Sequence, residues 1–261
     1  MSLAQIVRTG AENPTQKRER RKDARPGELL AAALDVFVEK GFAATRVEDI
    51  AQRAGVSKGT LFLYFPSKED LFKALVRENI TSNFPHWREG LQNFSGGMAA
   101  MLHLSAQGWW LHVGATKASG IMKLMVSEGA KFPDLSRFYQ DEVVTPSDHM
   151  LLGILQRGVD LGEFRADVPL VDVVHSFVAA MLYLMIAKHM AQSGAQSGAQ
   201  SEQAPTLPIN PRKFLSNHVN LLLAGICVQT GAAALAQAQA EAYMETMVHD
   251  ADCPPCSVLN S

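Results

Sequence analysis

The sequence predicts an all-α protein, with a small N-terminal helix-turn-helix domain followed by a larger helical domain. Two short helical patterns separated by a tight turn occupy residues 45–65. From residue 86 to residue 192 the apolar residues recur at helical spacing, and we find no alternating strand pattern of useful length. Hydrophobic residues make up 47% of the 261 residues, which is enough for a substantial core.

Residues 1–25 lack periodic apolar spacing, and basic side chains outnumber acidic ones there. We expect a disordered basic arm, which either stays solvated or contacts nucleic-acid phosphates and a minor groove. The first helix is expected over residues 26–40, because proline suits a first helical position. Its inward stripe comprises Leu29, Leu30, Ala33, Leu34 and Phe37. Gly41 should end this helix.

The stretch from Thr45 to Lys68 is expected to form two short helices joined by a turn. Thr45 and Glu48 are spaced as a capping box that opens the first of them. Gly55 can take the left-handed conformation that ends a helix, and Ser57 can cap the second helix. Pro66 stops the second helix, since proline lacks the required donor. Ser67 and Asp70 then open a further helix. Helix, turn and helix in this order suit the DNA major groove.

The second of these helices presents residue types that suit DNA. Its outward positions combine a cation, hydroxyls, bare backbone and apolar side chains, which suit phosphates, sugar edges and thymine methyl groups. A lysine at the start of the next helix adds a second phosphate site. The candidate DNA-binding residues are Thr45, Arg46, Lys58, Gly59, Thr60, Phe62, Leu63, Tyr64 and Lys68. The alternative is a helical hairpin that only packs.

One longer motif string makes the prediction more specific. It comprises Ile50-Ala51, Ala54-Gly55-Val56-Ser57-Lys58-Gly59-Thr60-Leu61, Tyr64-Phe65, Ser67-Lys68-Glu69 and Leu71, and upstream Leu29 to Ala33, Phe37 and Lys40-Gly41-Phe42. Over about residues 27–80 this string resembles the DNA-binding domain of the tetracycline-repressor (TetR) family of bacterial regulators. The resemblance implies an all-helical homodimer that binds a palindromic operator and releases it on binding a small molecule. The family often has tyrosine where Phe62 stands, so the contact of that hydroxyl with a phosphate is lost here.

A further helix, after the two short helices of the helix-turn-helix, is expected from Lys68 to about Asn83, and Pro85 kinks or ends it. It joins the two domains and is therefore the expected lever between them. A helix that is apolar nearly all round should follow over residues 98–115, and others over 118–130, from Pro133 and over 150–161. Residues 125–139, together with Gly158 and the run Gly162 to Arg165, resemble the ligand domain of the AefR-like subgroup of the family.

Two strongly apolar helices, over residues 168–191 and 211–229, bracket a low-complexity loop at 193–208. In the resembled family such a pair meets its copy in a four-helix dimer interface. The candidate interface residues are Val174, Phe177, Val178, Met181, Met185, Phe214, Leu215, Leu222 and Ile226. An Ala- and Gln-rich segment over residues 232–248 is expected to form a loosely held extra helix.

The sequence offers few candidates for chemistry. The eight histidines are scattered, and we find no nucleophile elbow and no phosphate-binding glycine loop. Cys253 and Cys256, with His249, Asp250 and Asp252 nearby, could bind metal or act as a redox pair, but a plain tail fits better. We therefore predict no catalytic, cofactor or metal site, and we expect that the protein is not an enzyme.

A set of aromatic and methionine side chains is either ordinary core or, in part, the lining of a pocket for a bulky apolar ligand. The candidate pocket residues are Trp109, Trp110, Met122, Met125, Phe138, Tyr139, Met150, Phe177 and Met181. Few charges fall among them, so the expected effector is small, hydrophobic and weakly polar. Its identity cannot be predicted.

The net charge of −2 hides an asymmetry between the two ends of the chain. Residues 1–80 carry 14 Lys and Arg and 11 Asp and Glu, which leaves 10 and 15 for residues 81–261. A basic front and an acidic back fit DNA binding at one end. Three cysteines without a secretory signal favour the reducing cytoplasm. The resemblance to the TetR family implies a bacterial, nucleoid-associated protein. The strongly apolar run between Asp172 and Lys188 has 15 residues without Asp, Glu, Lys or Arg, which is short of a membrane span.

Together these observations predict a DNA-binding regulator with an arm at 1–25, a DNA-binding domain at 26–80, a ligand-binding and dimerisation domain at 81–230 and an extension at 231–261. Its expected partners are an operator duplex, a second copy and a small hydrophobic effector, with no membrane. One alternative is a helical enzyme or ligand carrier. Another is a DNA-binding dimer that acts through protein partners without an effector.

Overall fold

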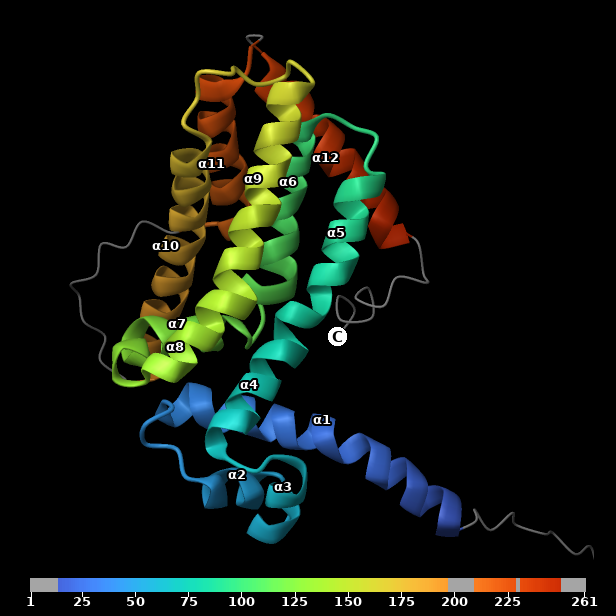
Figure 1. The fold of residues 1–261 in the computed structure, drawn as a ribbon, viewed down its shortest axis with the longest axis vertical. Coiled ribbons are helices and arrows are strands. Elements are labelled where there is room, and N and C mark those ends of the chain that lie inside the picture. Colours follow the sequence, from blue (N-terminus) through green and yellow to red (C-terminus); the bar gives the residue numbers. More distant parts are fainter. Residues whose placement is uncertain (1–13, 197–208, 229–230, 250–261) are drawn as a thin grey trace, which may run out of the picture. The chain divides into compact units, whose positions relative to one another are not determined.

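A computed structural model describes residues 14–196, 209–228 and 231–249, and Figure 1 shows their fold. The first helices are α1 (Pro14–Lys40), α2 (Val47–Arg53), α3 (Lys58–Tyr64), α4 (Lys68–Asn79), η1 (Thr81–Asn83) and α5 (Phe84–Asn93). There follow α6 (Met98–Trp109), η2 (Trp110–Gly114), α7 (Ser119–Glu128), η3 (Gly129–Lys131), α8 (Pro133–Tyr139), η4 (Gln140–Val144) and α9 (Thr145–Asp160). The last helices are α10 (Leu170–Gln196), α11 (Pro211–Ile226) and α12 (Ala232–His249). Within the described ranges no strand occurs beyond one isolated bridge, so the predicted all-α class is confirmed.

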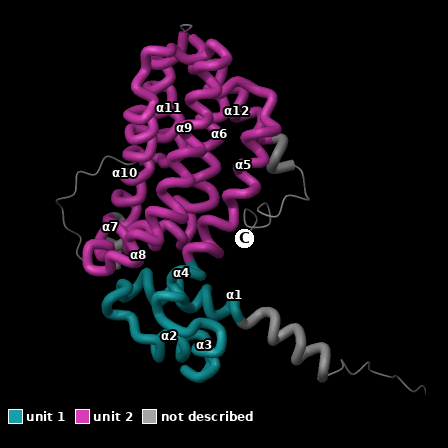
Figure 2. The backbone as a smooth tube through the Cα atoms, viewed as in Figure 1, with its two compact units in different colours: residues 1–75 teal, residues 76–261 magenta. Residues whose placement is uncertain are grey.

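The chain divides into two compact units, residues 1–75 and 76–261 (Figure 2). Unit 1 holds α1, α2, α3 and the first part of α4. Its core includes three mutually packed rings, with centroids 5.4 Å apart for Phe37 and Phe42, 5.6 Å for Phe37 and Phe72, and 5.4 Å for Phe42 and Phe72. These rings fix α1 and α4 as the support of the α2–α3 pair.

The first helix is longer than predicted, because α1 begins at Pro14 and passes through Pro26. The predicted start at Pro26 is therefore wrong, and so is the predicted disorder of residues 14–25, because α1 continues through them. Residues 1–13 of the predicted arm lie outside the described residues. Proline removes one backbone donor but can be accommodated within a helix. The other end agrees with the prediction, since Gly41 has φ +81° directly after Lys40.

The predicted helix from Lys68 to Asn83 ends earlier, at Asn79. A 3-10 turn (η1) and a new helix follow, and Pro85 occupies the first turn of α5 instead of ending a helix. Two further predicted helices contain π-helical turns, at η2 after α6 and at η4 between α8 and α9. Single π turns occur often at functional sites.

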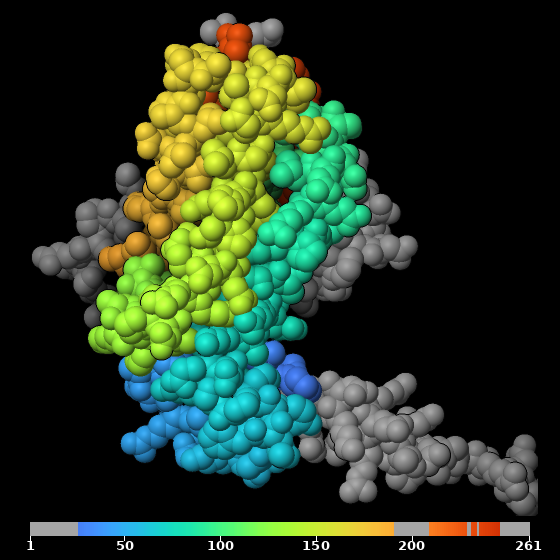
Figure 3. Space-filling view, in the orientation of Figure 1, coloured from blue at the N-terminus to red at the C-terminus, as the bar shows by residue number. Residues whose placement is uncertain are grey.

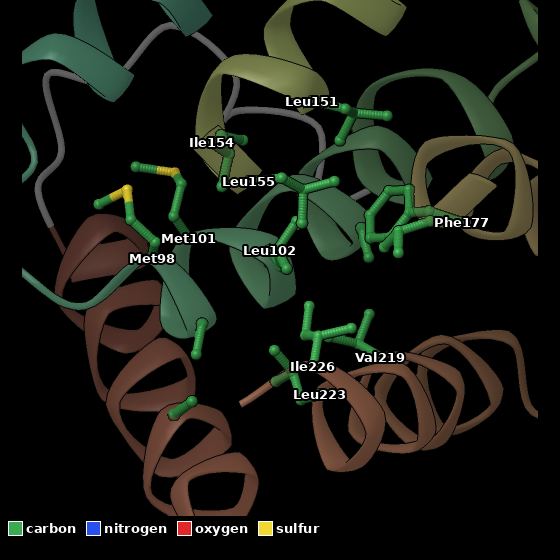
Figure 4. Close-up of a cluster of buried hydrophobic side chains, with 14 of the residues drawn as sticks. Met98, Met101, Leu102, Leu151, Ile154, Leu155, Phe177, Val219, Leu223 and Ile226 are labelled. Carbon is green, nitrogen blue, oxygen red and sulfur yellow. The ribbon is translucent and has the colours of Figure 1, made fainter. Parts of the chain in front are cut away.

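The core of unit 2 is built from α6, α9, α10 and α11, and Figure 4 shows part of it. Met98 and Leu102 of α6, Leu155 of α9, and Leu223 of α11 are among its fully buried members. The extra helix α12 is not loosely held as predicted. It packs along α6 and α11, with Ala236 and Ala240 each 4% exposed. Small alanine side chains allow this close approach, so α12 belongs to the bundle.

Helix α10 runs past the predicted end at Ala191, to Gln196. Its segment Leu170–Met190 is long and apolar enough to cross a membrane by length and composition alone. One side of the segment packs against α7, α9 and α11. Exposed apolar side chains on its other side, including Val171, Tyr183, Ile186 and Met190, suit a bundle surface that meets another subunit.

The connection between α9 and α10 depends on a close contact at Gly158. A Cβ atom built there would lie 2.2 Å from two ring carbons of Phe164, whose side chain is 1% exposed. Phe164 also forms the bridge to Cys227, beside a hydrogen bond from Arg165 N–H to Ile226 C=O at 2.8 Å. The packing thus holds the α9–α10 corner to the end of α11.

Replacing Gly158 with alanine should lower the free energy of unfolding by about 1–3 kcal/mol, because the buried ring must shift. Chemical denaturation measures this. The matched control is Gly153→Ala on the same helix, where a Cβ meets no atom within 4 Å and the gain in helix propensity is the same. Equal free energies of unfolding for the two variants would show that the Phe164 ring can shift without a cost in stability.

Candidate nucleic-acid interface

The α2–turn–α3 segment has helix-turn-helix geometry built by local hydrogen bonds. Gly55 has φ +66°, as predicted, and the N–H of Val56 donates to the C=O of Ala51 at 2.9 Å. Ser57 caps α3, since its Oγ accepts from the N–H of Thr60 at 3.0 Å. Helix α3 ends at Tyr64, and the following Phe65 is extended, as expected before a proline. The predicted pair of short helices is confirmed.

The cap of α2 differs from the prediction. The N-cap residue is Arg46, and its N–H donates to the Asp49 carboxylate at 3.2 Å, so the proposed Thr45–Glu48 box is wrong. Thr45 is only 2% exposed, and its hydroxyl donates to the Gly41 carbonyl at 2.6 Å. Its side chain therefore supports the α1–α2 corner, and the prediction that it touches DNA conflicts with this burial.

The predicted α3 residues form an exposed surface of unit 1 (Figure 3). Leu63 is 84% exposed and Phe62 is 37% exposed, while Thr60 and Tyr64 are half-buried. Gly59 is exposed, and a Cβ there would meet only Ser57 Oγ at 3.7 Å. Phe62 and Leu63 are adjacent, so together they form an apolar patch on this surface, and apolar patches often mark contact surfaces.

Ion pairs tie the cations of this unit to nearby acids. Lys58 Nζ lies 2.5 Å from Glu48 Oε1 and 5.6 Å from the centroid of the Phe62 ring. The bond from Lys58 holds the pKa of Glu48 below its ordinary value, and the bond from Lys40 does the same for the pKa of Asp49. All four side chains are solvent-accessible, so these pairs contribute little stability and can be exchanged for phosphate at small cost.

Lys68 has a structural environment that its sequence position did not suggest. Its Nζ donates to the carbonyl of Phe42 at 2.8 Å and to that of Thr45 at 3.1 Å, and it lies 4.4 Å from the Phe42 ring centroid. These bonds attach the first turn of α4 to the α1–α2 corner. The predicted phosphate contact of Lys68 stays a prediction, with this positioning role beside it.

Replacing Lys68 with methionine should reduce the free energy of unfolding by about 1–2 kcal/mol, because two carbonyls lose a charged donor. Thermal or chemical denaturation measures this, with Lys123→Met, an exposed lysine of α7, as control. If Lys68 also contacts a phosphate, the substitution should reduce the slope of log DNA affinity against log salt concentration by about one unit. If neither stability nor the salt slope changed, both roles would be excluded.

One link between elements could not be read from the sequence. Arg77, near the end of α4, donates from Nε to Glu142 Oε2 at 2.8 Å and from Nη2 to Glu142 Oε1. Its guanidinium also lies 5.0 Å from the centroid of the Phe138 ring. The bidentate bond raises the pKa of Arg77. Since 65 residues separate the partners, no local pattern signals the pair. It ties α4 to the π-helical turn η4.

The predicted pocket residues are spread over several helices of unit 2. Phe177 (3% exposed) and Met181 (7%) belong to the main core, and Tyr139 is buried with a hydroxyl that makes no hydrogen bond. Burial raises the pKa of that hydroxyl. The half-buried members are Trp109, Trp110, Met122, Met125, Phe138 and Met150. The cavity described below, between α6, α11 and α12, includes none of the nine side chains.

The predicted interface residues lie largely on the wrong faces of α10 and α11. Those that are buried within the subunit are Val174, Phe177, Met181, Met185, Leu215 and Ile226. They cannot offer surface to a second copy, because the apolar stripe of each helix already packs into the bundle. Val178, Phe214 and Leu222 are half-buried. The exposed apolar side chains of this region are Val171, Tyr183, Ile186, Met190, Leu221 and Val228.

In the part of the chain that is described, no group of three or more His, Cys, Asp or Glu side chains could hold a metal ion. Cys253 and Cys256 lie outside the described residues, so the tail prediction stays open. The fold and the exposed α3 surface define a class: helical proteins that present an N-terminal helix-turn-helix to DNA.

Comparisons with known proteins give the family. A family model described as bacterial regulatory proteins, tetR family, matches residues 29–75. The HTH-type transcriptional repressor KstR2 of Rhodococcus jostii is 30% identical over 148 residues, which cover 56% of this chain and 71% of KstR2. The chain belongs to the TetR family. The HTH-type transcriptional regulator RutR of Escherichia coli is 51% identical over 69 residues, 26% of this chain, so the match spans only 32% of RutR.

Solved structures support the fold. The transcriptional regulator FadR from Bacillus subtilis, in complex with stearoyl-CoA, has a TM-score of 0.58 at 20% identity, covering 76% of this chain and 98% of FadR. A gamma-butyrolactone receptor (ArpA-like protein) has a TM-score of 0.64 at 16% identity, covering 85% of this chain and 99% of the receptor. At these identities the likeness concerns architecture alone.

Proposed function

We propose that this protein is a cytoplasmic transcriptional repressor that binds a palindromic operator as a homodimer and releases it when a small hydrophobic ligand binds. The observation that carries the proposal is the correctly capped helix-turn-helix, whose α3 presents Lys58, Phe62 and Leu63 to solvent. A helical enzyme or carrier would not need this motif with its outward face left uncovered. The relatives named as transcriptional regulators favour the same reading.

DNA contact would involve Arg46, Lys58, Gly59, Thr60, Phe62, Leu63 and Tyr64, with Lys68 placing or contacting the backbone. Lys58 would exchange Glu48 for a phosphate, and Gly59 would allow close approach of the α3 backbone. Phe62 and Leu63 would meet sugar edges and thymine methyl groups. This division predicts that substitution of Lys58 weakens binding to all DNA sequences, whereas substitution of Phe62 changes which sequence is preferred.

The effector site is proposed among α6, α7, α8 and α10, because tryptophan and methionine side chains of these helices and their ends are half-buried and can change conformation. Met122 and Met125 of α7 can adapt to a bulky apolar molecule. So can Trp109 and Trp110, whose rings lie next to each other. The complex of FadR with stearoyl-CoA and the name of the gamma-butyrolactone receptor show that similar folds bind such compounds. The buried, unbonded hydroxyl of Tyr139 offers one polar contact.

Coupling would pass through the Arg77–Glu142 pair. A ligand that displaces α8 or η4 moves the carboxylate to which α4 is bonded, and α4 begins in the DNA-binding unit. Such coupling is typically about 1–3 kcal/mol, or roughly 5–150-fold in affinity. Glu142→Gln keeps the size of the side chain and removes its charge. It should reduce the ligand-induced change in operator affinity while leaving ligand affinity without DNA nearly unchanged.

The test begins with selection of bound fragments from random DNA, which should return an inverted repeat. Hydrophobic compounds such as acyl-CoA esters and lactones are then titrated by tryptophan fluorescence, with and without that operator. Linkage requires the operator to weaken ligand binding by the factor by which the ligand weakens operator binding. A ligand that bound equally well in both titrations would favour the alternative of a DNA-binding dimer without an effector. Failure to enrich any fragment would overturn the proposal.

A further inference from the structure

A cavity of about 820 Å³ lies between α6, α11 and α12, apart from the proposed effector site. Helices α11 and α12 are joined through residues 227–231, yet the cavity is lined by the first half of α11 and the second half of α12. The two helices therefore separate as they leave their connection, as Figure 1 also shows. Helix α6 closes the space from behind. Its volume is within the range of small-molecule sites.

The floor of the cavity is polar although it is buried. Gln107, 9% exposed, donates from Nε2 to Arg212 C=O and to Ser216 Oγ, each at 3.0 Å. Its Oε1 accepts from Arg212 Nε at 3.4 Å. The amide thus fixes the guanidinium side chain at the start of α11. A bundle with a purely structural seam would bury apolar side chains here, since buried amides require every bond to be satisfied.

A chain of hydrogen bonds fixes the opposite wall. Asn220 Nδ2 donates to Gln237 Oε1 at 2.6 Å, and Gln237 Nε2 donates to Glu241 Oε1 at 2.8 Å. Asn220 Oδ1 lies 3.1 Å from His103 Nε2, so the histidine is the donor at the buried end. Burial lowers the pKa of His103, which keeps the ring neutral and leaves Nδ1 as an acceptor. The Glu241 carboxylate is thereby oriented before any ligand arrives.

Charges of opposite sign line the two walls without meeting. Arg212 and Lys213 belong to the α11 wall, and Glu241 and Glu245 to the α12 wall. Among the described residues, no ion pair within 4.0 Å joins one wall to the other, although all four side chains border the same cavity. A ligand of a single charge would pair with one wall and face repulsion from the other. These four residues are exposed, so an apolar ligand would leave them to water and gain nothing from them, whereas a ligand with both charges would pair with both walls.

We propose that this cavity is a second ligand site, which binds a small zwitterion. Its carboxylate would lie towards Arg212 and Lys213, and its ammonium group towards Glu241 and Glu245. The amide of Gln107 and the ring of His103 at the floor restrict the orientation. The site shares no residue with the proposed effector pocket, and its occupancy would hold α12 against α11.

The experiment uses the full chain and straight ω-amino acids from 4-aminobutanoate to 8-aminooctanoate in isothermal titration calorimetry. One length should bind at least about 10-fold more tightly than the alkylamine and the alkanoate of the same chain length, because each of those meets one repulsive wall. Lys213→Gln and Glu245→Gln change exposed side chains and should each weaken that binding at least about 10-fold. Thermal unfolding of the free variants checks that both are folded.

The matched control is Glu89→Gln on α5, an exposed acid outside the cavity, which should leave binding unchanged. Weakening by Glu89→Gln as large as that by Glu245→Gln would indicate a general charge effect and overturn the proposal. So would equal binding of the alkylamine or the alkanoate. Absence of binding by every chain length at probe concentrations of about 10 mM, well above the millimolar affinities of weak sites, would also overturn the proposal.

Discussion

Replacing Gly59 with glutamate should abolish operator binding, with a loss of at least about 100-fold in affinity. Gly59 is exposed in the first turn of α3, and a Cβ there meets only Ser57 Oγ at 3.7 Å, so the substitution fits the folded protein. Glutamate is a better helix former than glycine and is favourable near a helix N-terminus. On DNA the same carboxylate would be pressed against phosphates. Like charges in contact cost several kcal/mol, and about 1.4 kcal/mol corresponds to a factor of ten.

The control for this prediction is Gly153→Glu on α9. Gly153 is also exposed and helical, and a Cβ there meets no atom within 4 Å. Both variants change the net charge equally and gain similar helix propensity, so they differ only in the surface they alter. Fluorescence anisotropy with the selected operator should give normal affinity for Gly153→Glu. Equal affinities for both variants would place the DNA-binding surface elsewhere.

The helix-turn-helix could be predicted because its signals are local. Gly55, Ser57 and Pro66 each act on backbone within a few residues, and each has the predicted role in the structure. The error at Thr45 has a similar cause. A hydroxyl three residues before an acid matches a capping pattern, but this hydroxyl is drawn inward by the carbonyl of Gly41. Sequence spacing cannot show which of two nearby acceptors a side chain chooses.

Long-range features were beyond the sequence. Lys68 reaches the carbonyl of Phe42 across 26 positions, and Arg77 reaches Glu142 across 65. Helical periodicity identified α10 and α11 but not which side of each helix faces the bundle. Helix α10 is apolar nearly all round. On α11, Leu221 is 74% exposed, although it is as apolar as the buried Leu223 two positions away. Only the packed structure distinguishes them.

Replacing Leu221 with glutamate should dissociate the proposed dimer, raising its dissociation constant at least about 1,000-fold. The exposed apolar residues of α10, namely Val171, Tyr183, Ile186 and Met190, recur on one side of the helix, and the exposed Leu221 lies seven residues after Phe214 on α11. Tyr183 packs against Phe214 of α11, with ring centroids 5.6 Å apart, so the two sides are continuous. We therefore place the interface on this outer surface in place of the buried stripe.

The size of the expected effect follows from symmetry. In a two-fold interface each substitution occurs twice, so two carboxylates would be buried without partners and two leucine side chains would no longer pack against the other subunit. Together these cost about 4 kcal/mol or more, which corresponds to about 1,000-fold in the dissociation constant.

Leu161→Glu is the control, because Leu161 is comparably exposed at 59% but lies beyond the end of α9. Sedimentation equilibrium at micromolar concentration should find Leu221→Glu monomeric and Leu161→Glu dimeric. A monomer carries only one helix-turn-helix, so the operator affinity of Leu221→Glu should fall as well. A wild-type chain that is monomeric under these conditions would contradict the dimer itself.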